Sequence, residues 1–308
     1  MIRIPPFLEK GQKAALVSPA GCIEPACLQR GADTLEKWGL QCVTGRNAGK
    51  RFGPFAGTDR ERLEDFQHAL DDPDIHAIVC TRGGYGAVRI IDRLDFSAFL
   101  ETPKWIVGFS DITVLLSHLQ QNLHVAGIHA AMPQTYPAPD TPEYEAAVES
   151  LRKALFGETL THRFPGQALN RPGKTTAPVI GGNLSILYSL RGTATDIDPT
   201  GKILFIEDLD EFDYHIDRMM MNLKRGGWFE RIAGLMVGSF THIKKGAHPY
   251  GCDVWDIINP YTENLPYPVC YGFPAGHIPR NHALYTGVPA QLEVTATDRE
   301  SSSLRFLF

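Results

Sequence analysis

Apolar and polar positions along the first half of the chain follow a pattern typical of alternating strands and helices. Short apolar runs predict buried strands at residues 14–18, 41–44, 77–80 and 105–107, with a further short strand near residue 125. Helical spacing of apolar or charged positions predicts helices at residues 26–38, 59–70, 87–94 and 113–121. Because strands and helices alternate at this spacing, we expect a parallel sheet with helices on both faces.

The composition changes at residues 163–176, which are rich in Pro, Gly and polar side chains and predict a linker. The predicted domains are therefore residues 1–162 and residues 177–308. In the second domain, apolar runs predict strands at residues 202–207, 234–238 and 268–272. Helical patterns between these runs predict helices at residues 214–225 and 254–263. Alternation around a polar turn predicts a β-hairpin at the end of the chain. The expected fold is α/β in two lobes: a doubly wound, flavodoxin-like parallel sheet, then an α/β domain that ends in the hairpin.

Charge and composition narrow the class of protein. The 308 residues include 30 Lys and Arg against 35 Asp and Glu, a formal net charge of −5, with 43% hydrophobic and 21% charged residues. These proportions are typical of a globular chain, and the acidic balance argues against nucleic acid as a partner. The six cysteines form no CxxC pair, and no apolar stretch approaches a membrane span or a signal-peptide core. We therefore expect a cytoplasmic protein without a membrane partner.

A glycine-rich turn follows the strand predicted at residues 77–80. Residues 81–86 read TRGGYG and precede a predicted helix. Glycines allow backbone N–H groups to approach a ligand closely, and a following helix terminus favours an anion or an oxyanion. The stretch is not a dinucleotide fingerprint, because the third glycine of that pattern is missing. Glycines that serve only a tight strand-to-helix turn are an equally good interpretation of this motif alone.

A serine occupies the turn after the next predicted strand. Residues 108–113 read GFSDIT, so Ser110 would sit on a sharp strand-to-helix turn, where a hydroxyl projects outward and the next amide can stabilise an oxyanion. The second glycine of the GxSxG pattern is absent, since Ile112 holds its place. Taken by itself, a serine in this place before a helix is more often simply the N-cap of that helix.

A serine nucleophile needs a base and a carboxylate that orients the base. His277 stands out among eleven histidines because it lies in a constrained loop, GFPAGHIPR, after a predicted strand. Glu207 lies at the carboxyl end of the predicted strand KILFIE. Four further acids follow it, and a solvated helix N-terminus explains them better than a cation site, because no HExxH or His/Cys set accompanies them: Asp208, Asp210, Glu211 and Asp213.

In this order along the chain, the motifs resemble the LD-carboxypeptidase family of serine peptidases. The resemblance rests on RGGYG, GFSDIT, FIED with the downstream YHIDRM and RGG, and GFPAGH, and it runs from VSPAG near the start to the predicted hairpin. The family contains muramoyltetrapeptide carboxypeptidases and microcin-immunity relatives. Its two-lobed form agrees with the domain boundary drawn above.

The resemblance implies a role for each matching residue. Ser110 matches the nucleophile, Glu207 the carboxylate and His277 the general base, while the backbone N–H groups of Gly84 and Asp111 match the oxyanion donors. Ser110 and Gly84 come from one lobe and Glu207 and His277 from the other, so the resemblance implies an active site at the interface between lobes. It implies no cofactor and no metal.

The implied reaction is hydrolysis of the L,D-amide bond that joins the diamino acid of a peptidoglycan stem tetrapeptide to its terminal D-Ala, a step of murein recycling. The substrate would be a small peptide or a muropeptide, and the family resemblance suggests a homodimer. The sequence leaves open whether the diamino acid is lysine or diaminopimelate. It also leaves open which residue binds the terminal carboxylate. Arg82 and Arg280 flank the predicted site in sequence, but structural roles would explain them equally well.

Two alternatives remain at this point. A microcin-immunity-type peptidase would cleave a peptidyl- or aminoacyl-nucleotide amide with the same residues, and aromatic side chains placed to stack on a base would favour it. Trp228 is a candidate for such stacking, although packing is the commoner role. A non-enzymatic protein that binds a small ligand in a two-lobed cleft is the other alternative. It predicts tight binding that survives replacement of Ser110 by Ala.

Overall fold

The computed structural model describes residues 2–297 and 300–308. The chain divides into two units: unit 1 comprises Met1–Thr159 with Pro279–Tyr285, and unit 2 comprises Leu160–Ile278 with Thr286–Phe308. The stretch predicted as a linker, residues 163–176, lies within unit 2, where it holds one edge strand and the start of another. Prolines and glycines fit such a place, because an edge strand does not need every backbone N–H for pairing.

The sheet of unit 1 has the order β11-β5-β4-β3-β1-β2. Its strands are β1 (Lys13–Val17), β2 (Gln41–Thr44), β3 (Ile75–Cys80), β4 (Trp105–Gly108), β5 (Gly127–His129) and β11 (Leu284–Thr286). Strands β1 to β5 pair in parallel, in the spatial order 2-1-3-4-5 of flavodoxin-like folds. This confirms the doubly wound sheet. The strand expected near residue 125 begins two residues later, at Gly127, while Val125 forms an isolated bridge with Arg3.

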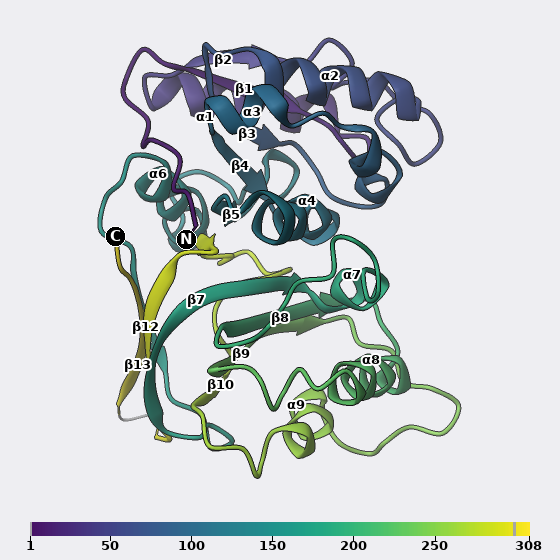
Figure 1. Ribbon diagram of the computed structural model, residues 1–308, viewed down its shortest axis with the longest axis vertical. Coiled ribbons are helices and arrows are strands. Elements are labelled where there is room, and N and C mark those ends of the chain that lie inside the picture. Colours follow the sequence, from purple (N-terminus) through teal and green to yellow (C-terminus); the bar gives the residue numbers. More distant parts are fainter. Residues whose placement is uncertain (1, 298–299) are drawn as a thin grey trace. The chain divides into compact units, whose positions relative to one another are not determined.

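Helices cover the sheet of unit 1 (Figure 1). They are α1 (Pro25–Lys37), α2 (Asp59–Asp71), α3 (Ser97–Glu101), α4 (Thr113–His118), α5 (Pro142–Tyr144) and α6 (Ser150–Leu155). A capping box between Thr58 and Glu61 begins α2. The helix predicted at 87–94 is wrong: Ala87–Arg89 and Ile91–Arg93 form two separate 3₁₀ turns. The β-branched side chains of this segment lower its helix propensity.

The sheet of unit 2 is mixed, with the order β10-β9-β8-β7-β12-β13-β6. Its strands are β6 (Thr161–Pro165), β7 (Gly173–Asn183), β8 (Ile203–Leu209), β9 (Gly234–Thr241), β10 (Val269–Tyr271), β12 (Pro289–Val294) and β13 (Ser301–Phe306). Strand β7 joins the two parts, because its first half pairs antiparallel with β12 and its second half parallel with β8. Strands β12 and β13 form the expected hairpin; residues 298 and 299 of its turn lie outside the described residues.

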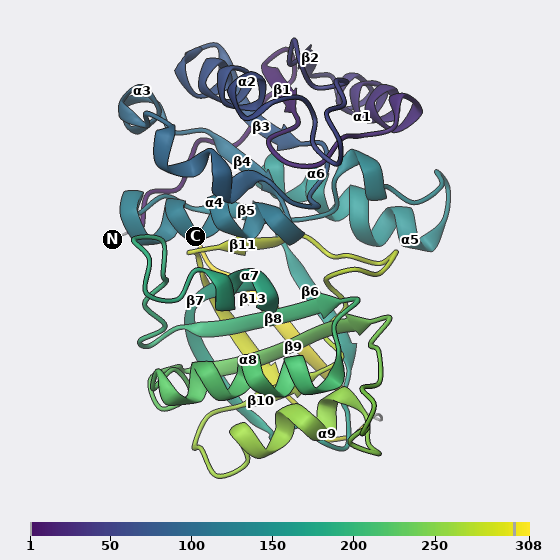
Figure 2. The same ribbon diagram turned by 90° about the vertical axis from the view of Figure 1, so that its right-hand side faces the viewer.

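Helices α7 (Leu184–Ser189), α8 (Asp213–Arg225) and α9 (Val254–Ile258) pack on the parallel part of this sheet (Figure 2). Apolar side chains from α8 and from the strands form the core between them, including Ile206, Met219, Leu223 and Val237. The helix predicted at 254–263 ends early, and Asn259–Tyr261 continues as a 3₁₀ turn. Pro260 explains the change, since it cannot donate the next helical hydrogen bond.

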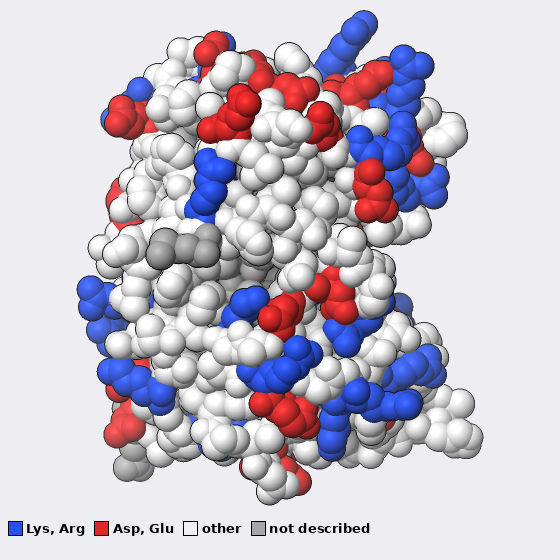
Figure 3. All heavy atoms as spheres, in the orientation of Figure 1, with Lys and Arg blue, Asp and Glu red and all other residues white. Residues whose placement is uncertain are grey.

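The described surface mixes charges of both signs. On the face drawn in Figure 3, Lys and Arg side chains of both units lie among Asp and Glu side chains, and the described residues there form no large patch of one sign. None of the helices in the described ranges is both long and apolar enough to cross a membrane.

Candidate active site

Ser110 occupies a strained turn between β4 and α4 in unit 1. Its φ is 61°, a left-handed conformation that is uncommon for a residue other than glycine. Strand β4 is fully buried, and Ser110–Ile112 forms a 3₁₀ turn that leads directly into the helix. The turn folds back so closely on the end of the strand that a Cβ on Gly108 would lie 2.8 Å from the side chain of Ile112. This strand–turn–helix geometry presents the Ser110 hydroxyl on a sharp bend, as nucleophile elbows do.

The glycine-rich loop of unit 1 lies against Ser110. A Cβ on Gly83 would lie 2.9 Å from the Cβ of Ser110, 3.1 Å from its Oγ and 3.2 Å from the amide nitrogen of Asp111. Gly84 has a φ of 97°, which favours glycine. The loop therefore brings the neighbourhood of Gly84 to the same place as Ser110 and the Asp111 amide. Backbone N–H groups gathered beside a serine hydroxyl are what an oxyanion hole requires.

The side chain of Asp111 anchors this loop, a role that the sequence did not suggest. Asp111 is buried, and its Oδ2 accepts a 2.8 Å hydrogen bond from the backbone N–H of Ala87. Burial raises the pKa of Asp111 to about 6. The buried guanidinium of Arg62 adds a second anchor by donating to the carbonyl oxygens of Pro19 and Gly86, at 2.6 and 2.9 Å. The conformation of the loop thus depends on charged side chains outside the TRGGYG motif.

Glu207 and His277 form a buried pair in unit 2. Glu207 comes from the carboxyl-terminal part of β8 and is fully buried, whereas the side chain of His277 is 14% exposed. The Nδ1 atom of His277 lies 2.6 Å from Oε2 of Glu207. A carboxylate at Nδ1 orients the ring so that Nε2 serves as the basic atom, as in serine hydrolase triads. The structure thus brings together two predicted residues that are 70 positions apart.

Burial and charge act in opposite directions on His277. Burial lowers its pKa, but the charge and hydrogen bond of Glu207, with the charges of Asp208 and Asp210, outweigh burial and raise the pKa above the ordinary 6.5. A raised pKa makes the neutral imidazole a stronger base and stabilises the imidazolium that proton transfer would produce.

The backbone around the pair is shaped to bring Glu207 and His277 together. The pairing of β8 with β9 shifts register between Ile206 and Asp208, an irregularity that re-aims the intervening Glu207. Gly276 precedes the histidine with a φ of 115°. A Cβ on Gly276 would lie 2.4 Å from Oγ of Ser239 and 2.8 Å from Oε2 of Glu207, so the close approach requires glycine.

The solvated acidic face expected after Glu207 is wrong for two of its four acids. Asp208 and Asp213 are buried. Asp208 accepts hydrogen bonds from the Asn183 side chain at 2.9 Å and from the Ser185 amide at 2.8 Å, which ties the end of β8 to the start of α7. Burial and the charge of Glu207 raise the pKa of Asp208 to about 7. The spacing of acids in the sequence could not distinguish this role, because the partners come from the end of β7 and the start of α7.

The other residues that the sequence suggested for substrate binding each have contacts within their own unit. Arg82 is half-buried and donates a 2.7 Å hydrogen bond to the carbonyl oxygen of Cys22 in unit 1. Arg280 is exposed and pairs with Glu143, also in unit 1. Trp228 is buried in the core of unit 2, and Arg191 lies over its ring, so Trp228 is a packing residue. In the part of the chain that the structure describes, no three His, Cys, Asp or Glu side chains are grouped to hold a metal ion.

Family models match most of the chain. The LD-carboxypeptidase N-terminal domain matches residues 14–130, and the LD-carboxypeptidase C-terminal domain matches residues 176–292. The chain belongs to the LD-carboxypeptidase family, and the protein is a serine-type carboxypeptidase. Both the fold and the activity class expected from the sequence are thereby confirmed.

Individual relatives agree with this assignment. The chain is 34% identical over 291 residues to the probable murein peptide carboxypeptidase of Bacillus subtilis, covering 94% of this chain and 91% of the relative. It is 32% identical to the murein tetrapeptide carboxypeptidase of Pseudomonas aeruginosa over 91% and 93% of the two chains. The crystal structure of muramoyltetrapeptide carboxypeptidase from Oxalobacter formigenes superposes with a TM-score of 0.85 at 26% identity, over 96% and 98%. The microcin C7 self-immunity protein MccF of Escherichia coli is 26% identical over 80% of each chain.

Proposed function

We propose that this protein removes the terminal D-Ala from peptidoglycan stem tetrapeptides by hydrolysing the L,D-amide bond. The relatives named as murein peptide and murein tetrapeptide carboxypeptidases support this substrate class. The single observation that carries the mechanism is the buried Glu207–His277 pair at 2.6 Å, in which a carboxylate orients a base. The strained Ser110 beside the glycine loop supplies a matching nucleophile.

In this mechanism, Nε2 of His277 takes the proton of Ser110 as the hydroxyl oxygen attacks the scissile carbonyl carbon. Glu207 holds the imidazole by its Nδ1–H and stabilises the imidazolium. The backbone N–H groups of Gly84 and Asp111 donate to the oxyanion of the tetrahedral intermediate. His277 then returns the proton to the leaving amine of D-Ala, and water hydrolyses the acyl-enzyme in a second round of the same proton transfers. The mechanism requires Ser110 to meet Nε2 of His277 during turnover.

A carboxypeptidase also has to recognise the free carboxylate of its substrate, and we propose Arg82 for this task. Arg82 directly precedes Gly83, the glycine that lies against Ser110, and makes no ion pair among the described residues. The hydrogen bond to Cys22 uses Nη1, and the remaining guanidinium N–H groups can donate to a carboxylate.

A second candidate reaction is cleavage of a peptidyl- or aminoacyl-nucleotide amide by the same residues. The similarity to MccF favours it. The burial of Trp228 removes the stacking residue that the sequence suggested for a nucleobase. We therefore place the murein peptide first.

The test is mass spectrometry of a murein tetrapeptide incubated with the wild-type protein and with Ser110→Ala, without added metal. Loss of one alanine with the wild type only supports the proposed reaction. If the tetrapeptide survives while a peptidyl-adenylate analogue is cleaved, the second candidate is correct. If the wild type cleaves neither, and a ligand still binds to Ser110→Ala, the protein binds without chemistry.

A further inference from the structure

Two buried oxygen atoms of unit 2 have no hydrogen bond and take no part in the mechanism described so far. Within the described part of the chain, neither Oε1 of Glu207 nor Oγ of Ser239 has a partner, although both atoms are shielded from solvent. The other carboxylate oxygen, Oε2, lies 2.6 Å from Nδ1 of His277. A buried polar group without a partner costs free energy, and a buried charge with few partners costs more. Pairing the serine hydroxyl with the carboxylate would lower both costs.

A β-bulge places Ser239 opposite Glu207. Between Ile206 and Asp208, strand β8 contributes a single residue, which is Glu207. Over the same stretch, β9 contributes two residues, Gly238 and Ser239. An extra residue in one strand re-aims side chains, and such bulges are common beside active sites. In this sheet, the extra residue brings a serine next to the carboxylate that orients the base.

The glycine before His277 leaves an open space between the serine and the carboxylate. A Cβ on Gly276 would collide with Oγ of Ser239 and would lie 2.8 Å from Oε2 of Glu207. The space of one absent methyl group therefore separates the two side chains. Rotation of the serine about its Cα–Cβ bond moves the hydroxyl between three staggered positions. A displacement of that size suits the space between the hydroxyl and the carboxylate.

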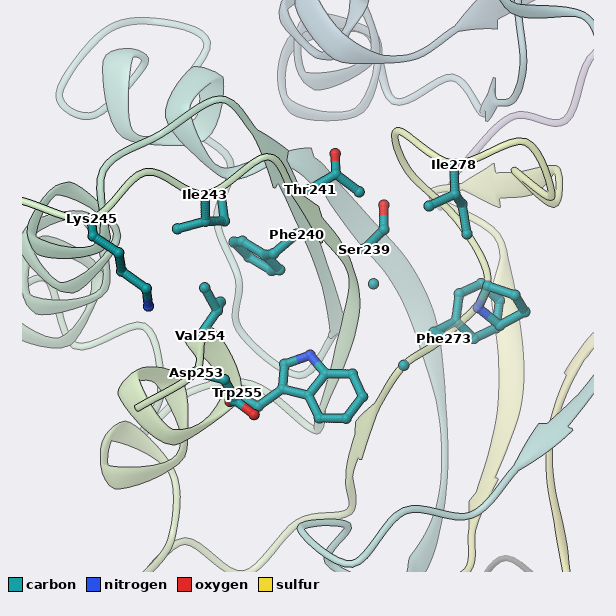
Figure 4. A pocket seen from close by; sticks show the side chains of 13 residues that line it. Ser239, Phe240, Thr241, Ile243, Lys245, Asp253, Val254, Trp255, Phe273 and Ile278 are labelled. Carbon is teal, nitrogen blue, oxygen red and sulfur yellow. The ribbon is translucent and has the colours of Figure 1, made fainter. Parts of the chain in front are cut away.

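The surroundings of Ser239 favour an acceptor within the protein. Figure 4 shows Ser239 at the edge of a cavity of about 500 Å³, with its hydroxyl directed away from the rings of Trp255 and Phe273. The backbone N–H of Ser239 donates to the carbonyl oxygen of Ala275 at 3.0 Å, which fixes the serine beside the loop that carries His277. Because the backbone makes this link, a change of the side chain removes the hydroxyl and leaves the link in place.

We propose that Ser239 is a positioning residue of the triad, whose hydroxyl donates a hydrogen bond to the Glu207 carboxylate. The inference rests on the proposed function in one respect, that Glu207 orients His277 as the base. The imidazole holds the carboxylate from one side and the serine holds it from the side of β9. The carboxylate plane is then fixed, and with it the direction in which Nε2 of His277 points. In this role the serine touches no reacting atom and acts only through Glu207.

The hydroxyl also reduces the charge that His277 experiences. Burial lowers the pKa of His277, but three carboxyl groups outweigh burial and raise it. The charge and hydrogen bond of Glu207 contribute most, and the charges of Asp208 and Asp210 add to them. A donated O–H offsets part of the carboxylate charge. Removing the hydroxyl should therefore raise the pKa of His277 further, whereas breaking the Glu207–His277 pair should lower it.

The test follows the His277 imidazole by NMR titration in the wild type and in Ser239→Ala. The spectrum of His277→Gln assigns its signals among those of the eleven histidines. Ser239→Cys keeps the size of the side chain but replaces the hydroxyl with a weak donor, so it gives the same measurement if the alanine variant folds poorly. Ser117→Ala is the matched control: the Ser117 hydroxyl is also buried and has no hydrogen bond to any described residue, but it belongs to α4 of unit 1.

The expected result is that the pKa of His277 rises by roughly 0.5 in Ser239→Ala and Ser239→Cys and stays constant in Ser117→Ala. In a Glu207→Gln background, Ser239→Ala no longer produces the rise, because the charge on which the hydroxyl acts is gone. An unchanged or lowered pKa in Ser239→Ala overturns the inference. An equal rise in Ser117→Ala, or a rise that persists in the Glu207→Gln background, overturns it as well.

Steady-state release of D-Ala from a murein tetrapeptide is scored separately. Ser239→Ala should lower kcat about tenfold and leave KM unchanged, because the lost hydrogen bond holds the carboxylate and not the substrate. Full kcat in Ser239→Ala, beside an active wild type, would show that the serine does not position the base. If the His277 titration responds as expected but the wild type releases no alanine, the proposed reaction is contradicted and the bond between Ser239 and Glu207 is supported.

Discussion

The two halves of the proposed catalytic machinery are built by different means. In unit 1, the parts are backbone: Ser110 at a φ of 61°, and Gly83 close enough that a Cβ would lie 2.9 Å from the Cβ of Ser110. In unit 2, the parts are buried charges, with Glu207 fully enclosed and 2.6 Å from His277. The Ser110 turn and the glycine loop depend on close backbone packing, so atoms added there would displace the neighbouring groups. A buried charge pair depends on electrostatics and tolerates no loss of a partner. Substitutions that change volume or charge should therefore affect the two halves differently.

The largest effect is expected from removing the reacting groups themselves. Ser110→Ala and His277→Ala should each lower kcat by at least about 10⁴-fold, and the double variant should be little worse than either single one, because the residues act as a unit. Steady-state release of D-Ala measures this. Ser189→Ala, a change at an exposed hydroxyl of α7, should retain full activity. Additive losses in the double variant would show that the two halves do not act together.

Neutralising Glu207 tests the electrostatic half. Glu207→Gln should lower kcat by about 10³–10⁴-fold, since the orientation of His277 and the stabilisation of its imidazolium are lost. In the wild type, kcat/KM should rise with pH as His277 loses its proton, with a midpoint above 6.5 because the pKa of His277 is raised. The midpoint should move to lower pH in Glu207→Gln.

The control for this variant is a second Glu–His pair in unit 2. Nδ1 of His215 lies 2.5 Å from Oε2 of Glu211, but that pair is partly exposed and joins two positions of local sequence. Glu211→Gln should leave both kcat and the pH midpoint unchanged. If the pH midpoint of kcat/KM stays constant in Glu207→Gln, the group whose ionisation causes the rise of kcat/KM with pH is not His277.

Adding one methyl group tests the backbone half. Gly83→Ala should lower kcat by about 10²-fold, the effect typical of a disturbed oxyanion donor, because its Cβ would press on Ser110 and on the Asp111 amide. Gly49→Ala is the matched control, since its Cβ meets only a Leu28 methyl at 3.7 Å, an ordinary contact. Single-turnover measurements separate acylation from binding. Full activity in Gly83→Ala would remove the glycine loop from the mechanism.

A smaller effect is expected from the carboxyl group that anchors the loop. Asp111→Asn should lower kcat about tenfold by weakening the bond to the Ala87 amide. The folded-state pKa of Asp111, about 6, lies above its unfolded value. Ionisation therefore costs stability as pH rises from about 4 to 6, by at most about 3 kcal/mol. The free energy of unfolding, measured by urea titration at both pH values, should lose this dependence in the variant.

The control for that prediction is another buried aspartate of unit 1. Asp65 accepts hydrogen bonds from the backbone and side chain of Asn47, and burial raises its pKa as well. Asp65→Asn should alter the pH dependence of stability but leave kcat unchanged. A loss of activity as large as that of Asp111→Asn would mean that general destabilisation, rather than loop position, explains both.

The contrast between the halves also explains what could be predicted. The Ser110 turn and the glycine loop are marked by local sequence, because their geometry arises within a few residues. The candidates Glu207 and His277 were proposed from strand ends and family motifs, and their pairing depends on packing between β8 and the loop after β10. Neither the anchoring of the glycine loop by Asp111 and Arg62 nor the burial of Asp208 was foreseen. A carboxylate looks the same in a sequence whether water or a distant amide will satisfy it.

The sequence by itself determined the alternation of strands and helices in much of unit 1, the parallel sheet of that unit, the final hairpin and the family, because hydrophobic periodicity and turn residues act over short distances. It also marked Ser110, Gly84, Asp111, Glu207 and His277 as candidates. Only the tertiary structure decided which acids are buried and how closely His277 can approach Glu207, since Gly276 leaves room for the pair. These features depend on side chains that are distant in sequence and meet only when the sheet has formed. The free energy of a buried charge is set by such neighbours and not by its position in the chain.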